Sequence, residues 1–332
     1  MAKVTILVPI DSKGRVRRVG VLLRLLSLPY GDFDINVAGD VSSILESRSM
    51  GLDALSGIRL AVKVLHDVSR PLNGVVHAFF WYIRPTAGRL ILEADQSPSQ
   101  FFTGYLNMAL AKGPVKALYR DSIIVTWSRW ARDGFLRDGF REDQVKVVPL
   151  PYVEGVFKAS AVKERAVAFI GYDYYRKGGD IALRVMAVVK AVDPAVKAIY
   201  VGKMPHRVPR FIDEYHPYLP RARVLQILAK SMVALAPSRH EAYGLAAMDA
   251  MANGAVVIAS DVEGLGEFVK ANGGVACPLN DLDCLVENTL KYLDEKNHEA
   301  KASLQLERLR QNHDPAKIRG MMRRVYEEAV KP

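Results

Sequence analysis

The chain has 332 residues, of which 50% are hydrophobic and 25% charged, and its formal net charge is +10. This length leaves room for two domains with buried cores. No apolar stretch reaches the ~18 residues that a bilayer crossing needs, and the amino terminus lacks the residue order of a signal peptide, so we expect a cytoplasmic globular protein. The positive charge favours an anionic partner, such as a nucleotide, a lipid phosphate or an acidic glycan. No zinc-finger spacing or aromatic RNA-binding signature accompanies it, which argues against nucleic acid.

In the first half of the chain, short apolar strands alternate with helical stretches. The strand-like segments are residues 4–9, 33–37, 75–79, 90–92, 123–126 and 145–148. Such alternation is typical of a parallel sheet covered by helices. We therefore predict a Rossmann-like α/β domain over residues 1–150.

Much of the excess positive charge surrounds the apolar run 19–26, at Lys13, Arg15, Arg17, Arg18 and Arg24. One interpretation is an ordinary first helix with a solvated face. The other is a basic amphipathic helix, in which the segment Lys13–Arg24 touches an anionic membrane surface or a lipid-linked acceptor.

A segment rich in Pro, Tyr and Gly, residues 149–157, then interrupts the pattern, and we interpret it as an interdomain linker. A second alternation follows, with strand-like segments at 166–171, 198–202, 232–236, 255–259 and 274–277. It predicts a second Rossmann-like domain over residues 151–314. The amphipathic helix at 315–332 stands apart from the last strand, so packing back on the first domain is an alternative to packing on the second.

The chain has two cysteines, Cys277 and Cys284, and no His or Cys near them that would complete a metal site. We expect both to be packing residues. A disulfide between them is the less favoured alternative, because a cytoplasmic protein is kept reduced. The chain also lacks a dinucleotide-binding glycine signature, a phosphate loop and a nucleophile elbow, which excludes hydride transfer and P-loop chemistry.

The stretch 237–254 contains two carboxylates, Glu241 and Asp249, eight positions apart around the pair Tyr243-Gly244. A buried strand is predicted to end at Pro237 and a helix to begin near Gly244. Ligands bind at the carboxyl ends of parallel strands, and helix starts attract phosphates or hydroxyls. Glu241 is then placed to face a ligand, and Asp249 to touch a second part of it. The alternative is that Glu241 caps the helix and Asp249 is solvated.

A second loop of this kind follows the strand that ends at Gly171. It contains Arg176, Lys177, Gly178 and Gly179 before a helix. Glycines permit close backbone approach, and the two cations would suit a diphosphate leaving group. The alternative is a solvated pair of basic residues, but two such loops in one domain could flank one crevice.

Together these residues resemble the family 4 glycosyltransferases of the GT-B fold. The signature is a Pro-Ser pair at 237–238, Glu241, the aromatic-glycine pair 243–244 and a second acidic residue at 249. Further similarities run in the family's order. Gly171 with Lys177-Gly178 resembles the diphosphate loop, Gly264 to Glu267 a glycine-rich turn, residues 149–157 the interdomain segment, and Trp127-Ser128 a short turn before it. The resemblance covers most of residues 120–290.

The resemblance implies two Rossmann-like domains whose parallel sheets face across a cleft, and a retaining, metal-independent transfer of a sugar from a nucleotide diphosphate sugar. No cofactor beyond this donor is implied. Glu241 would face the sugar, Lys177 and Arg176 the diphosphate, and Asp249 the ribose. The donor-binding residues would be Gly171, Tyr172, Gly178, Gly202, His240, Ala242, Tyr243, Gly244, Leu245, Asp249 and Glu267. An anionic or membrane-associated acceptor would enter from the amino-terminal domain, where Ser12, Lys13, Gly14 and Asp95 follow strands.

Three positions depart from the family's pattern. The second carboxylate is Asp249 instead of Glu, and Tyr172 stands where Arg is common, which leaves Arg176 as a substitute. The stretch 93–95 lacks the expected His, and we interpret His77, on another strand, as structural. An alternative is therefore a catalytically silent GT-B protein that binds a nucleotide sugar or serves as a partner subunit. A two-domain solute-binding protein is a third possibility, although that class normally carries an export signal.

Overall fold

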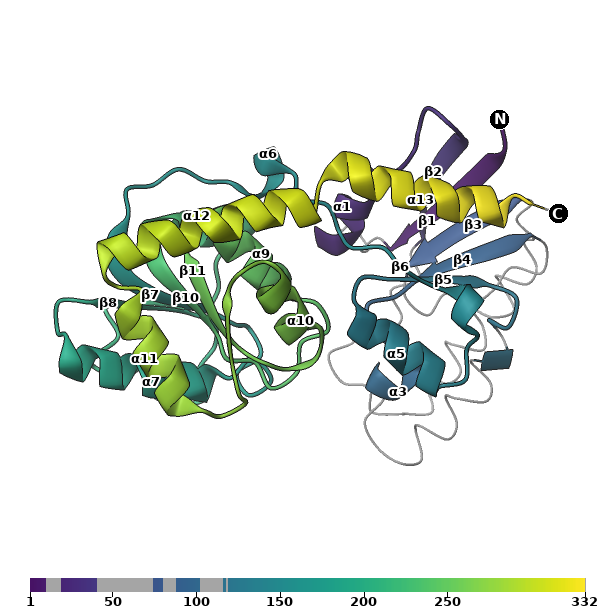
Figure 1. The fold of residues 1–332 in the computed structure, drawn as a ribbon. Coiled ribbons are helices and arrows are strands. Elements are labelled where there is room, and N and C mark those ends of the chain that lie inside the picture. Colours follow the sequence, from purple (N-terminus) through teal and green to yellow (C-terminus); the bar gives the residue numbers. More distant parts are fainter. Residues whose placement is uncertain (10–18, 41–73, 80–87, 102–115, 118, 332) are drawn as a thin grey trace. The chain divides into compact units, whose positions relative to one another are not determined.

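The structure is a computed structural model that describes residues 1–9, 19–40, 74–79, 88–101, 116–117 and 119–331 (Figure 1). The chain forms two compact units. Unit 1 comprises residues 1–151 and 315–332, and unit 2 comprises residues 152–314. Ser12, Lys13 and Gly14, expected on the acceptor side, lie outside the described residues.

Unit 1 contains a parallel sheet with strand order β2-β1-β3-β4-β5-β6. The strands are β1 (Lys3–Pro9), β2 (Asp34–Asp40), β3 (Val75–Phe79), β4 (Arg89–Glu93), β5 (Ile123–Thr126) and β6 (Val145–Val147). The α-helices that the structure describes in this unit are α1 (Val19–Leu26), α3 (Pro98–Phe101), α5 (Arg129–Arg137) and α13 (Pro315–Ala329). Every residue of β3 and of β5 is buried, as expected for strands covered on both faces.

Helix α13 belongs to unit 1, although the rest of the chain's last third belongs to unit 2. Its apolar face lies in the core of the β1 sheet through Ile318, Met322 and Val325. Near the carboxyl end of α13, Arg89 Nη1 donates to two carbonyl oxygens, that of Glu328 at 3.1 Å and that of Lys331 at 3.0 Å. A cation there suits the negative end of the helix dipole.

A buried polar cluster around Glu93 joins four elements of unit 1. Arg24 Nε donates to both carboxylate oxygens of Glu93 at 2.9 Å, and Trp127 Nε1 donates at 2.5 Å. His77, central in β3, contacts Glu93 at 3.1 Å through Nε2 and the Tyr326 hydroxyl at 2.8 Å through Nδ1. Burial raises the pKa of Glu93, but Arg24 and His77 outweigh it and hold the pKa below its ordinary value. His77 is thus a buried partner of Glu93 and Tyr326.

The expectation that Arg24 contributes to an exposed basic face is wrong. Its side chain is fully buried and pairs with Glu93, and Nη2 donates to Val148 O at 2.6 Å. A buried carboxylate needs a cation, and the charge of Arg24 neutralises Glu93 inside the unit. The other basic residues of this segment lie outside the described residues. In the part of the chain that the structure describes, no helix combines the length and the apolar character that a bilayer crossing requires.

Unit 2 contains a second parallel sheet with strand order β12-β11-β10-β7-β8-β9. The strands are β7 (Glu164–Ile170), β8 (Lys197–Val201), β9 (Glu214–His216), β10 (Ser231–Ala236), β11 (Val256–Ser260) and β12 (Val275–Cys277). The helices are α6 (Glu154–Phe157), α7 (Gly179–Val192), α8 (Arg221–Lys230), α9 (Leu245–Ala252), α10 (Glu263–Ala271), α11 (Leu282–Lys291) and α12 (Glu295–Asn312). Helices α7 and α11 lie together on one face of the sheet, and α9 and α12 lie on the other (Figure 1). This is the doubly wound α/β class predicted from the sequence.

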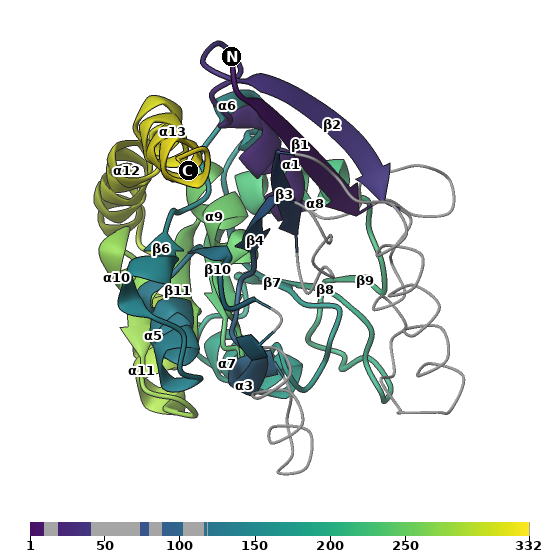
Figure 2. The same ribbon diagram turned by 90° about the vertical axis from the view of Figure 1, so that its right-hand side faces the viewer.

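The order of strands in unit 2 reverses beside β7. The chain runs outward from β7 to β8 and β9, and then returns to place β10 on the other side of β7 (Figure 2). Ligands of open α/β sheets bind at the carboxyl ends of the strands where the order reverses. The position that this rule selects is the edge formed by the ends of β7 and β10.

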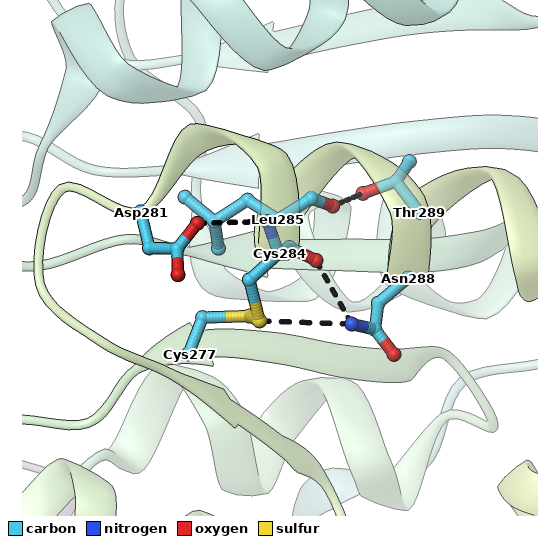
Figure 3. The surroundings of a disulfide bond; sticks show 6 residues. All are labelled: Cys277, Asp281, Cys284, Leu285, Asn288 and Thr289. Atoms are coloured by element: carbon cyan, nitrogen blue, oxygen red, sulfur yellow. Dashed lines mark hydrogen bonds between the residues drawn. A yellow bond between two sulfur atoms is a disulfide. The ribbon is translucent and has the colours of Figure 1, made fainter.

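The two cysteines form a disulfide, so the expectation of separate packing residues is wrong (Figure 3). Cys277 ends β12, and Cys284 lies in the first turn of α11, where its backbone N–H donates to the capping carboxylate of Asp281 at 2.9 Å. Asn280, with φ 65°, turns the chain just before this cap. The turn and the cap bring the first turn of α11 back over the strand, with the two Cα atoms 5.8 Å apart, within bridging distance.

Candidate functional site

Two loops of unit 2 meet at the edge selected by the strand order. One follows β7 and leads into α7, and the other follows β10 and leads into α9. The strands are hydrogen-bonded neighbours, with Leu235 opposite Phe169, so their carboxyl ends lie side by side. The two loops that the sequence singled out are therefore adjacent.

Glycine is required where the loop backbones touch. Gly178 precedes α7 with φ 70°, and a Cβ atom there would lie 1.9 Å from the carbonyl oxygen of Pro237 in the other loop. Gly202, after β8, has φ 147°, and its Cβ would lie 1.9 Å from the oxygen of Gly171. The loops are further joined by the backbone N–H of Arg239, which donates to Arg176 O at 2.8 Å.

The three predicted catalytic side chains come together across this junction. Lys177 Nζ forms an ion pair with Glu241 Oε2, and Arg176 Nη1 lies 3.4 Å from the same oxygen. Arg176 also donates to His240 O at 3.1 Å and pairs with Asp173 at 3.1 Å. Lys177 and Glu241 are only 19% and 17% exposed, so their attraction is less screened than that of a surface pair. Two cations and the carboxylate that both of them contact therefore lie together at this site.

A second ion pair, between two residues that no sequence pattern connects, also joins the loops. Arg239 donates through Nη1 and Nη2 to the two oxygens of Asp180 in the first turn of α7, both at 2.7 Å. The hydrogen bonds from Arg239 lower the pKa of Asp180, and those to Asp180 raise the pKa of Arg239. Fork-shaped pairs of this kind fix geometry as well as charge. Arg239 belongs to no recognisable pattern of its own, because it lies between the recognisable Pro237-Ser238 and Glu241.

The carboxylate of Glu263 is a further member of the site. Its Oε2 accepts the backbone N–H of Glu241 at 2.7 Å, and its Oε1 lies 2.9 Å from His240 Nδ1. The residue stands directly before the glycine-rich stretch 264–267, and that position was its one signal in the sequence.

The stretch 264–267 is not a turn but the first part of α10, which corrects the sequence-based expectation. Both of its glycines are buried, and a Cβ atom on Gly266 would lie 2.2 Å from an oxygen of Asp261. The glycines thus permit close packing of a helix that begins immediately after β11. Glu267, expected to bind the donor, is half-buried within α10.

Asp249, in the second turn of α9, pairs with Arg221 at the start of α8. Burial raises the pKa of Asp249 to about 6, and the nearby Arg221 opposes that shift only in part. Arg221 Nη1 also lies 3.4 Å from Val156 O, and its guanidinium lies 5.2 Å from the centre of the Phe157 ring. No spacing in the sequence predicts that Arg221, 28 positions away, pairs with Asp249.

The side chain of Tyr243 is buried, 5.5 Å from the Phe268 ring, and its hydroxyl lies 3.4 Å from His313 Nδ1. Gly244 follows with φ 111° and precedes the first helical residue, Leu245. Between Glu241 and Tyr243 lies the half-buried Ala242. The tyrosine ring is therefore a core contact of unit 2, and Gly244 beside it is buried as well.

Tyr172, which replaces the expected Arg, is 45% exposed. Its hydroxyl donates to Leu219 O at 2.9 Å, and its ring lies 5.6 Å from that of Tyr218. In unit 1, Asp95 follows β4. Among the described residues, no three His, Cys, Asp or Glu side chains group closely enough to hold a metal ion.

Comparison with known proteins identifies the class. Residues 156–307 match the model of the family described as glycosyl transferases group 1. The chain also shares its fold with solved glycosyltransferase structures, so the GT-B fold predicted from the sequence is confirmed. HepE of Anabaena, solved with UDP-glucose, superposes with a TM-score of 0.69 at 16% identity, over 99% of this chain and 100% of that one. Sucrose-phosphate synthase of Thermosynechococcus elongatus gives 0.68 at 15% identity, over 99% of each chain.

Curated relatives match over shorter stretches. Glycogen synthase of Mycobacterium tuberculosis is 27% identical over 139 residues, which are 38% of this chain and 33% of the relative. The D-inositol 3-phosphate glycosyltransferase of Segniliparus rotundus is 26% identical over 234 residues, 58% of this chain and 52% of the relative. The chain thus spans from a third to about half of the length of these relatives. The residues that match the group 1 glycosyltransferase model all lie within its carboxyl-terminal unit.

Proposed function

We propose that the chain transfers a sugar from a nucleotide diphosphate sugar to an acceptor, with retention of the anomeric configuration and without a metal ion. One observation carries the proposal. Lys177, Arg176 and Glu241 converge at the strand-order reversal of a group 1 glycosyltransferase domain. HepE, which has the same fold, was solved with UDP-glucose bound, and this supports a donor of that chemical class.

The reaction separates charge, and the site offers charges of both signs. The bond between the anomeric carbon and the β-phosphate oxygen breaks, and a bond to the acceptor oxygen forms on the same face. The acceptor's proton passes to the departing phosphate oxygen, so no protein nucleophile is needed. Lys177 and Arg176 would stabilise the negative charge that develops on the diphosphate. Glu241 would bind sugar hydroxyls once its ion pair with Lys177 opens.

The remaining donor contacts follow from position in unit 2. Gly178 and the backbone of residues 242–245 would allow the diphosphate and sugar to approach closely. Asp249 would contact the ribose together with Arg221, which holds it in the structure. The net charge of +10 supports an anionic or membrane-associated acceptor on the side of Asp95.

A thermal-shift screen against UDP-, GDP-, ADP- and dTDP-glucose tests donor binding. A ligand present at 100 times its dissociation constant adds about 2.7 kcal/mol to the free energy of unfolding. We expect one donor to raise the melting temperature, and that donor to release its nucleoside diphosphate when an acceptor panel is supplied, equally with and without EDTA. Absence of binding to all four donors would reject the function, and loss of turnover in EDTA would reject metal independence.

A nucleotide-sugar-binding protein without turnover is the second candidate. It is favoured by Tyr172 in place of a cation and by the engagement of Lys177 with Glu241 and of Asp249 with Arg221. Donor binding without hydrolysis or transfer to any acceptor of the panel would select it.

A further inference from the structure

Glu263 connects the start of α10 to the loop that carries Glu241. One oxygen of its carboxylate accepts the Glu241 N–H at 2.7 Å, and the other lies 2.9 Å from His240 Nδ1. The carbonyl oxygen of Glu241 accepts the N–H of Leu265 at 3.1 Å. Both backbone polar groups of Glu241 are therefore held by the first turn of α10.

The backbone of Glu263 is in an unfavourable conformation. Its φ is 49°, in the left-handed region that residues with a Cβ atom rarely adopt. Of the residues that the structure describes, only Asn280, with φ 65°, is another non-glycine residue with positive φ, and Asn tolerates this region better. Strain of this kind persists where surrounding contacts enforce it, and it concentrates at functional sites. A glycine would adopt this φ without strain. The contacts of the Glu263 side chain must therefore offset the strain of its backbone.

The charge of Glu263 is not used to neutralise the cations of the site. Lys177 and Arg176 both contact Glu241, whereas the ion-pair partner of Glu263 among the described residues is His240 alone. Its side chain is 23% exposed, so it lies at the rim of the site without being solvated freely. Its hydrogen bonds go to the Glu241 backbone and the His240 ring, both in the loop after β10.

We propose that Glu263 is a positioning residue: it fixes the Glu241 backbone and the His240 ring, so that the Glu241 carboxylate meets the donor sugar in one geometry. The effect on turnover that we expect rests on the proposed function. A positioning residue that contacts the loop rather than the diphosphate should affect kcat and leave the affinity for UDP nearly unchanged. A residue that serves only folding would change the melting temperature instead.

The test compares Glu263→Gly, Glu263→Gln and Glu263→Asp with a matched control, Asn280→Gly, which relaxes the other left-handed position. Release of UDP from UDP-glucose, the dissociation constant of UDP and the melting temperature are measured for each. We expect Glu263→Gly to keep its melting temperature within a few degrees of wild type, because glycine adopts this backbone conformation without strain. Its kcat should fall about 100-fold, because a small misplacement of a catalytic group can reduce the rate by that factor. Gln still accepts the Glu241 N–H and should stay within about fivefold of wild type. Asp is one methylene too short and should behave like Gly, whereas Asn280→Gly should match wild type.

Hydrogen exchange supplies a measurement that needs no donor. Amide exchange in residues 237–245 should accelerate in Glu263→Gly and stay unchanged in Glu263→Gln and Asn280→Gly, since only the first loses the acceptor for the Glu241 N–H. Unchanged exchange in Glu263→Gly would overturn the proposal whether or not the protein turns over UDP-glucose. Turnover by wild type with equal kcat in Glu263→Gly would overturn it while leaving the proposed function intact. If Glu263→Gly fails to fold, equal kcat and equal exchange in the Gln and Asp variants would count against it.

Discussion

Lys177 donates from Nζ to Oε2 of Glu241, so the cation and the carboxylate proposed for opposite ends of the reacting bond neutralise each other. In the proposed reaction, a phosphate of the donor would take the place of Glu241 beside Lys177. Donor binding would then exchange one anion for the other. Glu241 would become available to sugar hydroxyls after the diphosphate has arrived.

This exchange predicts that Glu241→Gln binds UDP more tightly than wild type, although it loses most turnover. The uncharged amide no longer competes for Lys177, and a partly buried pair of this kind is worth about 1 kcal/mol, or roughly a fivefold change in affinity. Isothermal titration with UDP measures the difference. The exposed Glu287→Gln, on α11, serves as the charge-matched control and should bind UDP as wild type does. Equal or weaker binding by Glu241→Gln would show that the ion pair does not compete with the nucleotide.

Lys177 itself is predicted to act on the transition state. Lys177→Ala should lower kcat about 10²–10³-fold, the loss expected when one fixed donor to a developing negative charge is removed. Lys177→Arg keeps the charge but not the compact ammonium geometry, and should recover only part of the rate. Both variants should unfold at nearly the wild-type temperature, which differential scanning calorimetry can verify. Turnover by Lys177→Ala at the wild-type rate would contradict the site assignment.

The two loops could be predicted from the sequence, because each is marked by residues that lie close together in the chain. Apolar runs end at Ile170 and Ala236, glycines follow, and parallel strands place such ends at one edge of the sheet. The chain order alone does not place β7 beside β10, but the family resemblance does. The fold class and the convergence of Arg176, Lys177 and Glu241 were accessible in this way.

The contacts that hold these residues were not accessible, because they join ordinary charged residues far apart in the chain. Arg239 reaches Asp180 across 59 positions, Arg221 reaches Asp249 across 28, and Glu263 reaches the Glu241 backbone across 22. No spacing rule distinguishes these pairs from solvated surface charges. The disulfide is not predictable from the cellular compartment, because it depends on the turn at Asn280 that brings α11 over β12.

The raised pKa of Asp249 makes a prediction about stability and pH. Its pKa is about 6 in the folded protein against an ordinary value of 3.8, so the folded state holds the proton more tightly than the unfolded chain. This contribution is present below the unfolded value and is lost as pH rises through 6. Between pH 7 and pH 4, wild type should therefore gain roughly 2–3 kcal/mol in free energy of unfolding relative to Asp249→Asn, which does not titrate.

Urea unfolding of both proteins at several pH values between 4 and 8 measures that difference. Groups common to both proteins titrate alike and cancel in the comparison. A constant difference between wild type and Asp249→Asn would mean that burial does not raise this pKa.

The contact between the two loop backbones predicts a large effect of one methyl group. Gly178→Ala places a Cβ atom 1.9 Å from Pro237 O at a φ of 70°, so either the loops separate or α7 shifts. Left-handed strain and overpacking together should cost roughly 2–4 kcal/mol of unfolding free energy. Gly155→Ala, in α6, is the matched control: nothing lies within 4 Å of its Cβ position, and alanine in a helix adds about 0.5–1 kcal/mol. Because separation of the loops would also move Lys177 away from Glu241, the kcat of Gly178→Ala should fall at temperatures where it remains folded. A folded, fully active Gly178→Ala would show that the junction tolerates displacement and that close backbone approach is not what aligns the site.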